Sequence, residues 1–209
     1  EKELEKRRDF TNDLIVTIDG LDAKDLDDAI SLSINDNGNY ELIVHIADVS
    51  YYVSKDSLVD KEAFTRGTSI YLADRVIPML PHSLSNGVCS LNPNELKLTM
   101  SSIMEIDGQG NVVNYEITPS YIKSSYRLDY DDVNKLFDNK ETRLSYDKPL
   151  KEMLFLMKRL SSILSRKMEN EGYIQLNIDE AKLIIDQNTN KVVSIEKRSG
   201  GTAEKMIEN

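Results

Sequence analysis

The chain has 209 residues and a net charge of −10, from 26 Lys and Arg against 36 Asp and Glu. Its composition, 40% hydrophobic and 30% charged, is typical of a globular protein large enough to bury a substantial core. It contains no apolar run of about 18 residues and no basic leader followed by an apolar stretch, so we expect no membrane span and no secretory signal. The single cysteine, Cys89, cannot form an internal disulfide, which favours a cytoplasmic location.

The acidic excess also limits what the chain can bind. Proteins hold nucleic acids largely through basic groups that displace counterions from the phosphates. We therefore expect this chain alone to hold RNA or DNA poorly. A nucleic-acid-binding role would need a basic surface that other polypeptide supplies.

The first part of the chain predicts a charged segment followed by β-structure. Residues 1–13 mix both charge signs without a strong apolar stripe, which indicates a solvated N-terminal segment. Strands are predicted over residues 14–18, 29–34 and 40–47, and the Asn-Gly dipeptide before the last of them is typical of a hairpin turn. A short helix is expected near residues 58–67.

The middle of the chain predicts an irregular loop and a second hairpin. Residues 78–93 hold Pro, Ser, Asn and Gly in quick succession, so we expect a loop or short turns there. The Gly-rich stretch 107–111 predicts a turn that joins strands over 98–106 and 112–118. A further strand is expected over 121–128.

The last part changes to a helical period. Apolar residues repeat at i, i+3, i+4 and i+7 from Leu150 to Met168, with Pro149 in the first turn, so a long amphipathic helix is predicted. Two short strands, 181–185 and 192–196, and a helix that starts at Thr202 follow. The whole pattern predicts an α+β fold with a mainly antiparallel sheet and helices packed against it.

An acidic loop lies between the first two predicted strands. Five aspartates fall within ten residues, namely Asp19, Asp22, Asp25, Asp27 and Asp28. Carboxylates held a few ångströms apart repel each other by about 1 kcal/mol per pair even in water, so a proton or a cation must relieve the repulsion. All-oxygen sites suit Mg²⁺ or Mn²⁺, and two such ions about 4 Å apart are a standard arrangement for phosphodiester hydrolysis. The loop predicts a metal-dependent nuclease.

Other interpretations of the loop are weaker. A hydrated acidic loop without function would not need five carboxylates between apolar strands. An EF-hand is disfavoured because the loop lacks the central Gly and the closing Glu, and no helices flank it. A Mg²⁺-dependent phosphatase of the haloacid dehalogenase type would use Asp25 and Asp27, but Ala29 stands where that family needs a hydroxyl, and its sheet is parallel.

Three further reactive side chains have mainly structural interpretations. His45 alternates with apolar neighbours in a predicted strand, and His82 lies in the irregular loop. Cys89 has no evident base beside it, so a thiol nucleophile is not predicted. Tyrosines could stack on nucleic-acid bases, but composition alone selects none of them.

The acidic loop and several later stretches closely resemble the catalytic (RNB) domain of the ribonuclease II and ribonuclease R family, with more detail in common with ribonuclease R. The matching stretches occur in the same order over nearly the whole chain. They are residues 17–29 (TIDGLDAKDLDDA), 46–53 (IADVSYYV), 66–71 (RGTSIY), 76–81 (VIPMLP) and 84–93 (LSNGVCSLNP). Several separated blocks in order are far more specific than one short motif.

The resemblance implies a processive 3′→5′ exoribonuclease that releases nucleoside 5′-monophosphates with Mg²⁺, for which Mn²⁺ could substitute. By position in the motif, the implied catalytic residues are Asp19, Asp25, Asp27 and Asp28. Of these, Asp19, Asp25 and Asp28 would be the metal ligands, and Asp27 would be the acid that cleavage needs. The implied RNA contacts are Tyr71, which would stack on the 3′-terminal base, and Tyr130, which would lie near the RNA path.

The chain also departs from the family. Cold-shock modules, an S1 module and the C-terminal segments of the RNB domain are not part of this sequence, so residues 14–209 correspond to the N-terminal portion of the catalytic domain. We expect single-stranded RNA with a free 3′ end as the partner of the parent chain, and little or no RNA hydrolysis by this fragment. The alternatives are a Mg²⁺-dependent phosphatase and a non-catalytic RNA-binding or scaffold descendant.

Overall fold

The computed structural model describes residues 2–72, 75–174, 180–186, 189, 191–198 and 200–208. Its strands are β1 (Arg8–Asp9), β2 (Val16–Asp19), β3 (Asp28–Ile34), β4 (Tyr40–Ala47), β5 (Ile70–Tyr71), β6 (Val76–Ile77), β7 (Leu96–Ile106), β8 (Val112–Lys123), β9 (Tyr126–Asp129), β10 (Glu180–Asp186) and β11 (Lys191–Arg198). Its helices are η1 (Leu4–Lys6), α1 (Val49–Tyr52), α2 (Leu58–Arg66), η2 (Ser83–Val88), α3 (Tyr130–Phe137), α4 (Lys148–Asn170) and α5 (Thr202–Glu208).

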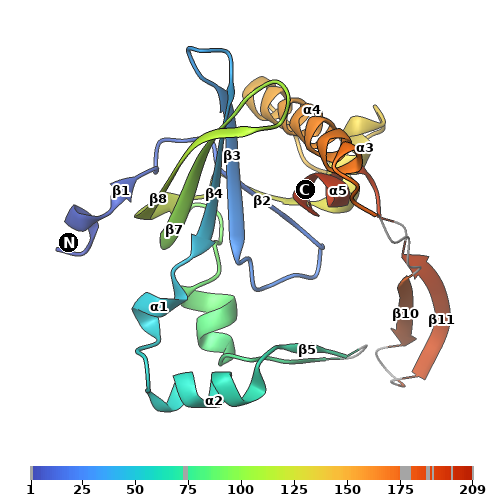
Figure 1. The fold of residues 1–209 in the computed structure, drawn as a ribbon. Helices are drawn as coiled ribbons and strands as arrows, with labels where there is room; N and C mark the ends of the chain where they lie inside the picture. The colour runs from blue at the N-terminus through green and yellow to red at the C-terminus, as the bar shows by residue number, and fades with distance from the viewer. Residues whose placement is uncertain are drawn as a thin grey trace.

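One large sheet organises the molecule, with the strand order β1-β8-β7-β4-β3-β2-β9 (Figure 1). The neighbours from β8 across to β2 pair antiparallel, whereas the two outer pairs, β1 with β8 and β2 with β9, are parallel. The predicted α+β fold with a mainly antiparallel sheet is therefore confirmed. β5 with β6 and β10 with β11 form two separate hairpins.

Helices α3, α4 and α5 gather against one face of the large sheet (Figure 1). The predicted long helix is confirmed as α4, which begins after Asp147, whose carboxylate accepts a hydrogen bond from the backbone N–H of Leu150 at 3.0 Å. Its buried stripe includes Leu150, Leu154 and Met157. No helix in the described part of the chain combines the length and the apolar character that crossing a membrane requires.

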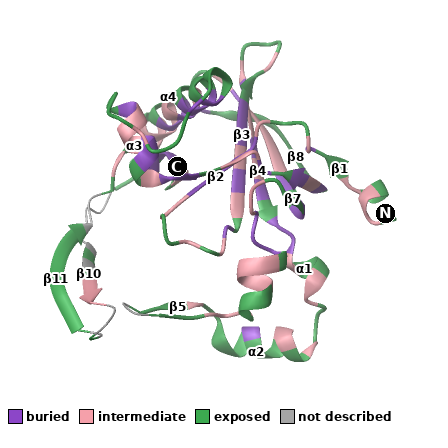
Figure 2. Ribbon diagram, turned by 180° about the vertical axis from the view of Figure 1, so that it is seen from behind, coloured by how far each residue is buried: buried purple, intermediate pink, exposed green. Residues whose placement is uncertain are grey.

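A second apolar cluster lies apart from the helix-covered one and reaches the acidic loop. It joins residues of the sheet with residues of three connecting segments: Phe10, Ile15, Leu26, Ala29, Ile43, Ala47, Cys89, Leu91 and Ile122. Leu26 belongs to the acidic loop and is completely buried. Figure 2 shows that buried residues follow the strands of the large sheet, whereas α2 and β5 carry mainly exposed residues.

The predicted hairpins are confirmed, and their turns need glycine. Gly38 and Gly110 have φ values of 81° and 84°, in the left-handed region that L side chains rarely adopt. The predicted helix near 58–67 is α2, which Ser57 caps by accepting a hydrogen bond from the N–H of Asp60 at 3.2 Å. The last predicted strands and helix correspond to β10, β11 and α5.

Two local predictions are wrong in detail. The strand expected over residues 121–128 is divided, because β8 ends at Lys123 and β9 begins at Tyr126 on the far side of the sheet. The region 78–93 is not wholly irregular, because it contains the π-helix η2. Six residues that include Asn-Gly carry no helical period, so the sequence pattern could not predict this turn.

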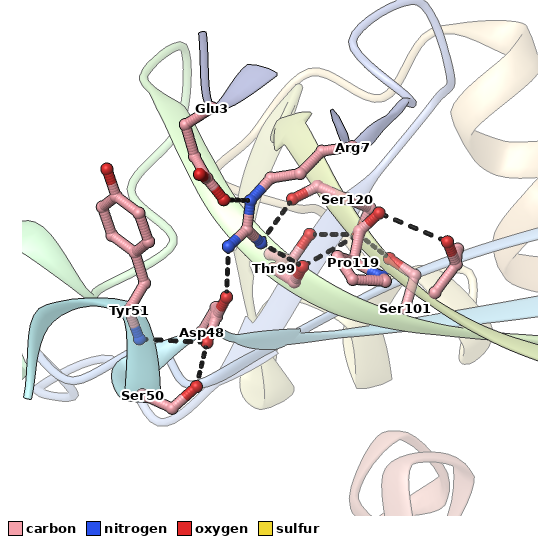
Figure 3. Close-up of polar contacts among 10 residues, drawn as sticks. Glu3, Arg7, Asp48, Ser50, Tyr51, Thr99, Ser101, Pro119 and Ser120 are labelled. Atoms are coloured by element: carbon pink, nitrogen blue, oxygen red, sulfur yellow. Dashed lines mark hydrogen bonds and ion pairs between the residues drawn. The ribbon is translucent and has the colours of Figure 1, made fainter. Parts of the chain in front are cut away.

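The N-terminal segment is largely exposed, as expected, but Arg7 and Phe10 anchor it to the folded domain. β1 pairs with β8, and the guanidinium of Arg7 forms ion pairs with Asp48 at 2.7 Å and with Glu3 at 2.9 Å (Figure 3). Arg7 also donates to the backbone carbonyls of Thr99 and Ser120. The Arg7 and Asp48 side chains are only 6% and 5% exposed. Apart from Glu3, these partners lie 41 or more positions away along the chain, beyond the reach of local patterns.

Candidate functional site

The acidic loop connects two neighbouring strands at one edge of the large sheet. β2 ends at Asp19 and β3 begins at Asp28. Because Val16 pairs antiparallel with Ile30, the end of β2 and the start of β3 lie at the same edge. The strand ladder therefore brings Asp19 and Asp28 together, and residues 20–27 form the loop between them.

Ser90 fixes the second half of the loop through its backbone. The Ser90 hydroxyl accepts a hydrogen bond from the N–H of Leu26 at 3.1 Å and donates one to the carbonyl of Lys24 at 2.9 Å. The N–H of Leu91 donates to the carbonyl of Leu26 at 2.8 Å. Because Leu26 and Ser90 are both completely buried, these bonds hold the backbone on either side of Asp25 in one conformation.

Two further contacts hold the rest of the loop. The guanidinium of Arg127, on β9, donates to the carbonyls of Leu21 and Ala23. At the other end, the N–H of Ala47 donates to the carbonyl of Asp27 at 2.9 Å. The acidic loop is thus bonded to β4, β9 and the segment after η2, and its aspartates project from a fixed backbone.

Three aspartates of the acidic loop, Asp19, Asp27 and Asp28, have raised pKa values. The pKa of Asp19 is raised to about 6 by burial and by the carboxylates of Asp28, Asp25 and Asp27, against a lowering contribution from Arg127. Burial also raises the pKa of Asp28. Asp27 is accessible to solvent, but partial desolvation and the charges of Asp25 and Asp28 still raise its pKa. Around Asp19, the negative charges of the neighbouring carboxylates outweigh the positive charge of Arg127.

The donor chemistry of the site fits a hard divalent cation. Oxygen Oδ2 of Asp19 is buried and has no hydrogen-bond partner in the described part of the chain, which is costly for a carboxylate unless a cation binds it. The side chains are not gathered into a finished ligand shell, since no group of three or more His, Cys, Asp or Glu among the described residues is arranged to hold a metal ion. The residue types suit the ion, although the described side chains are not arranged around one position.

Tyr71, predicted to contact RNA, lies beside the acidic loop. It is the second residue of β5, and its side chain is 65% exposed. Its hydroxyl donates a hydrogen bond to Oδ2 of Asp25 at 2.8 Å, and this contact raises the pKa of the tyrosine. The structure thus brings Tyr71 and the predicted metal ligands into one site, with the ring open to solvent.

Tyr130 lies deeper than Tyr71. It is the first residue of α3, is half-buried, and packs against the helix-covered core. The preceding residue, Asp129, caps α3 by accepting from the N–H of Asp132 at 3.1 Å and pairs with Arg143. Since Asp129 pairs with Asp19 in the β2–β9 ladder, Tyr130 follows directly on a neighbour of the acidic loop.

The remaining candidates have structural surroundings. His45 is completely buried, its Nδ1 lies 2.6 Å from the Ser101 hydroxyl, and burial lowers its pKa to about 4, so it stays neutral near pH 7. Ser101 continues into the buried hydroxyl chain of Figure 3. His82 is exposed and contacts Asn86, and burial raises the pKa of the Cys89 thiol. The surroundings of His45, His82 and Cys89 do not suggest a catalytic role for any of them.

Sequence reasoning missed the residues that hold the loop. Ser90 lies within one of the stretches that resemble the family, so that resemblance could have pointed to it. Arg127 lies three positions before Tyr130 in the sequence, but it is not part of a recognisable motif. Both act through backbone carbonyls or N–H groups, and such contacts leave no pattern in the residue types.

Comparisons with known proteins identify the family. The RNB domain matches residues 7–209. Ribonuclease R 1 of Lactococcus lactis is 47% identical over 208 residues, which cover 100% of this chain and 25% of that protein. Ribonuclease R of Thermotoga maritima is 50% identical over 208 residues, which cover 99% of this chain and 29% of that protein.

A solved structure has the same fold. Mycoplasma genitalium RNase R in complex with ribose methylated single-stranded RNA superposes with a TM-score of 0.93 at 35% identity, covering 99% of this chain and 32% of that one. The chain thus spans about a quarter to a third of the proteins it matches. Because the domain match extends over residues 7–209, this chain belongs to the RNB domain family.

Proposed function

We propose that this chain is the acidic-loop portion of a hydrolytic 3′→5′ exoribonuclease of the ribonuclease R type, which depends on Mg²⁺ and releases nucleoside 5′-monophosphates. The observation that carries the proposal is the buried oxygen of Asp19, which has no hydrogen-bond partner in the part of the chain that the structure describes and lies beside a fixed loop of carboxylates. The relatives named ribonuclease R support the reaction class. The RNA in the Mycoplasma complex supports the substrate class.

The residues of the site would have different roles according to their positions. Asp19, Asp25 and Asp28 would hold the divalent cation, which supplies charge neutralisation at the scissile phosphate and lowers the pKa of an attacking water. Asp27 projects from the same fixed loop and is accessible to solvent, so it can reach the terminal nucleotide. The backbone contacts of Ser90 and Arg127 keep these carboxylates at fixed positions, and such preorganisation favours in-line attack.

The RNA end would be positioned by the exposed ring of Tyr71. Base stacking on an aromatic ring contributes about 1–3 kcal/mol per base and tolerates every base. Tyr71 meets the acidic loop directly, so a base stacked there would bring its phosphate to the carboxylates. Tyr130, near Asp19 through β9, is the proposed second contact on the RNA path, and selection of RNA would depend on the 2′-hydroxyl.

The rest of the binding surface would come from other polypeptide. A net charge of −10 opposes the approach of an RNA backbone. We propose that cold-shock, S1 and C-terminal RNB segments of a longer parent chain supply the basic surface, and that the protein acts in the cytoplasm. The isolated 209-residue chain is then expected to bind divalent cations weakly and to hydrolyse RNA little or not at all.

The proposal is tested with the parent-length protein on a single-stranded RNA with a labelled 5′ end. Stepwise shortening from the 3′ end with release of nucleoside 5′-monophosphates, in Mg²⁺ but not in EDTA, is the expected result. Asp27→Asn should lower the rate by about 100-fold or more while RNA binding is retained. The matched control is Asp22→Asn, in the same loop but outside the proposed ligand set, which should keep most of the activity.

Two rival functions predict different results. A non-catalytic RNA-binding or scaffold protein, which the incomplete ligand arrangement favours, would bind RNA without shortening it. A Mg²⁺-dependent phosphatase would release inorganic phosphate from small esters, although the antiparallel β2–β3 pair around the loop disfavours the parallel sheet of that class. Unchanged nucleotide release by Asp27→Asn would remove Asp27 from the mechanism.

A further inference from the structure

The contact between Tyr71 and Asp25 joins the β5–β6 hairpin to the acidic loop. In the described part of the chain β5 pairs with β6, and this two-stranded hairpin is not part of the large sheet. The Tyr71 hydroxyl reaches across to Oδ2 of Asp25 in the acidic loop at 2.8 Å. The hairpin can therefore change position without breaking the sheet that carries Asp19 and Asp28.

The hydrogen bond from Tyr71 holds the carboxylate of Asp25, and separate contacts already fix the backbone on either side of this residue. The carbonyl of Lys24 and the N–H of Leu26 are both bonded to the buried hydroxyl of Ser90. A change in the direction of the Asp25 carboxylate must then come from rotation of its own side chain. The hydrogen bond from Tyr71 opposes that rotation.

The position in which Tyr71 holds Asp25 does not complete a ligand shell. Among the described residues, no group of three or more His, Cys, Asp or Glu side chains is arranged for a metal ion, although Asp25, Asp27 and Asp28 lie near enough to Asp19 to raise its pKa. The carboxylates are thus neighbours that have not converged. Asp25 is the one among them whose carboxylate accepts a tyrosine hydroxyl.

We infer that the Tyr71 hydroxyl competes with the divalent cation for the Asp25 carboxylate, so that cation binding releases Tyr71 and the β5–β6 hairpin from the acidic loop. This inference rests on the proposed function, because it takes Asp25 as a ligand of the ion. Release would leave the Tyr71 ring, already exposed, free to turn towards a nucleotide base. Cation binding and capture of the RNA end would then be coupled through one hydrogen bond.

The test measures Mn²⁺ binding to the 209-residue chain by electron paramagnetic resonance of the free ion. Tyr71→Phe removes the hydroxyl and keeps the ring, so it should bind Mn²⁺ about tenfold more tightly than wild type. Tyr71→Phe combined with Asp25→Asn should gain nothing over Asp25→Asn alone. Tyr115→Phe on β8, a tyrosine of similar exposure at 69%, is the matched control and should equal wild type.

A second measurement needs no metal. The ultraviolet difference titration of the tyrosines should show one hydroxyl with a lower pKa in Asp25→Asn than in wild type, and Tyr71→Phe should abolish that difference. If wild type and Asp25→Asn titrate alike, the hydrogen bond between Tyr71 and Asp25 is contradicted.

The outcomes separate the inference from the proposed function. Equal or weaker Mn²⁺ binding by Tyr71→Phe overturns the competition and leaves the metal site intact. A gain that persists in the Asp25→Asn background also overturns it, because the effect would not pass through Asp25. Wild-type affinity in Asp25→Asn contradicts Asp25 as a ligand. Failure of every variant to saturate at tens of millimolar Mn²⁺ overturns the inference for this chain, whereas the proposed function is tested separately on the parent-length protein.

Discussion

Asp19 combines a pKa raised to about 6 with a buried carboxylate oxygen that has no hydrogen-bond partner among the described residues. An acid whose pKa is higher in the folded than in the unfolded state favours folding when protonated, and this contribution is lost as the pH rises from about 4 through about 6. In EDTA, the free energy of unfolding of wild type should therefore fall over this range relative to Asp19→Asn. We expect Asp19→Asn to be more stable by about 1–3 kcal/mol at pH 7.5.

Urea unfolding at several pH values, followed by circular dichroism, measures this difference. Mg²⁺ should stabilise wild type at pH 7.5 and leave Asp19→Asn nearly unchanged, because binding to the folded state alone adds to stability. Asp36→Asn, in the exposed turn between β3 and β4, controls for the loss of a negative charge. A wild type that is more stable than Asp19→Asn in EDTA at pH 7.5 would show that another group already compensates the carboxylate.

At the scale of elements, Ser90 joins the segment after η2 to the acidic loop. Ser90→Ala leaves the buried N–H of Leu26 without a partner and removes the hydrogen bond to the carbonyl of Lys24, which should cost about 1–3 kcal/mol. Ser162→Ala on the exposed face of α4, where the hydroxyl bonds only to the carbonyl of Lys158, should change stability by less than about 0.5 kcal/mol. Equal costs in chemical denaturation would mean that Ser90 does not hold the loop.

The N-terminal segment makes a second prediction at this scale. Arg7→Met leaves the Asp48 carboxylate buried without its cation, which should cost about 3–5 kcal/mol. Arg8→Met breaks an exposed pair with Glu116 and should cost less than about 1 kcal/mol. Thermal unfolding of the two variants measures the difference. A small effect of Arg7→Met would mean that Arg7 does not anchor the segment.

The same elements show what local sequence patterns can predict. The strands, the two Gly-containing hairpins and α4 depend on the alternation or period of nearby residues, so they could be predicted. The burial of Arg7, the position of β9 beside β2 and the π-helix η2 could not, because each depends on partners far away in the chain or on a turn without periodicity. The aspartates were found by their spacing, whereas Ser90 and Arg127 hold the loop through its backbone atoms, so the residue types alone did not indicate this role.

At the scale of the whole molecule, this chain supplies the large sheet, its helices and the acidic loop. Most of the proposed RNA-binding surface would lie on other segments of a longer parent chain. The chain spans about a quarter to a third of the relatives it matches and carries a net charge of −10. Addition of the remaining RNB and cold-shock or S1 segments should therefore raise affinity for single-stranded RNA and make it strongly dependent on salt. An affinity of the 209-residue chain equal to that of the parent would contradict this division.

The most direct measurement is an anomalous difference map from crystals of this chain soaked in Mn²⁺. Our account predicts a peak at the sheet edge between Asp19 and Asp28, in contact with the oxygen of Asp19 that lacks a partner, with the Asp25 carboxylate rotated towards it and away from Tyr71. A map with no peak at the acidic loop, in crystals that bind Mn²⁺ elsewhere, would contradict the metal site and the nuclease proposed from it.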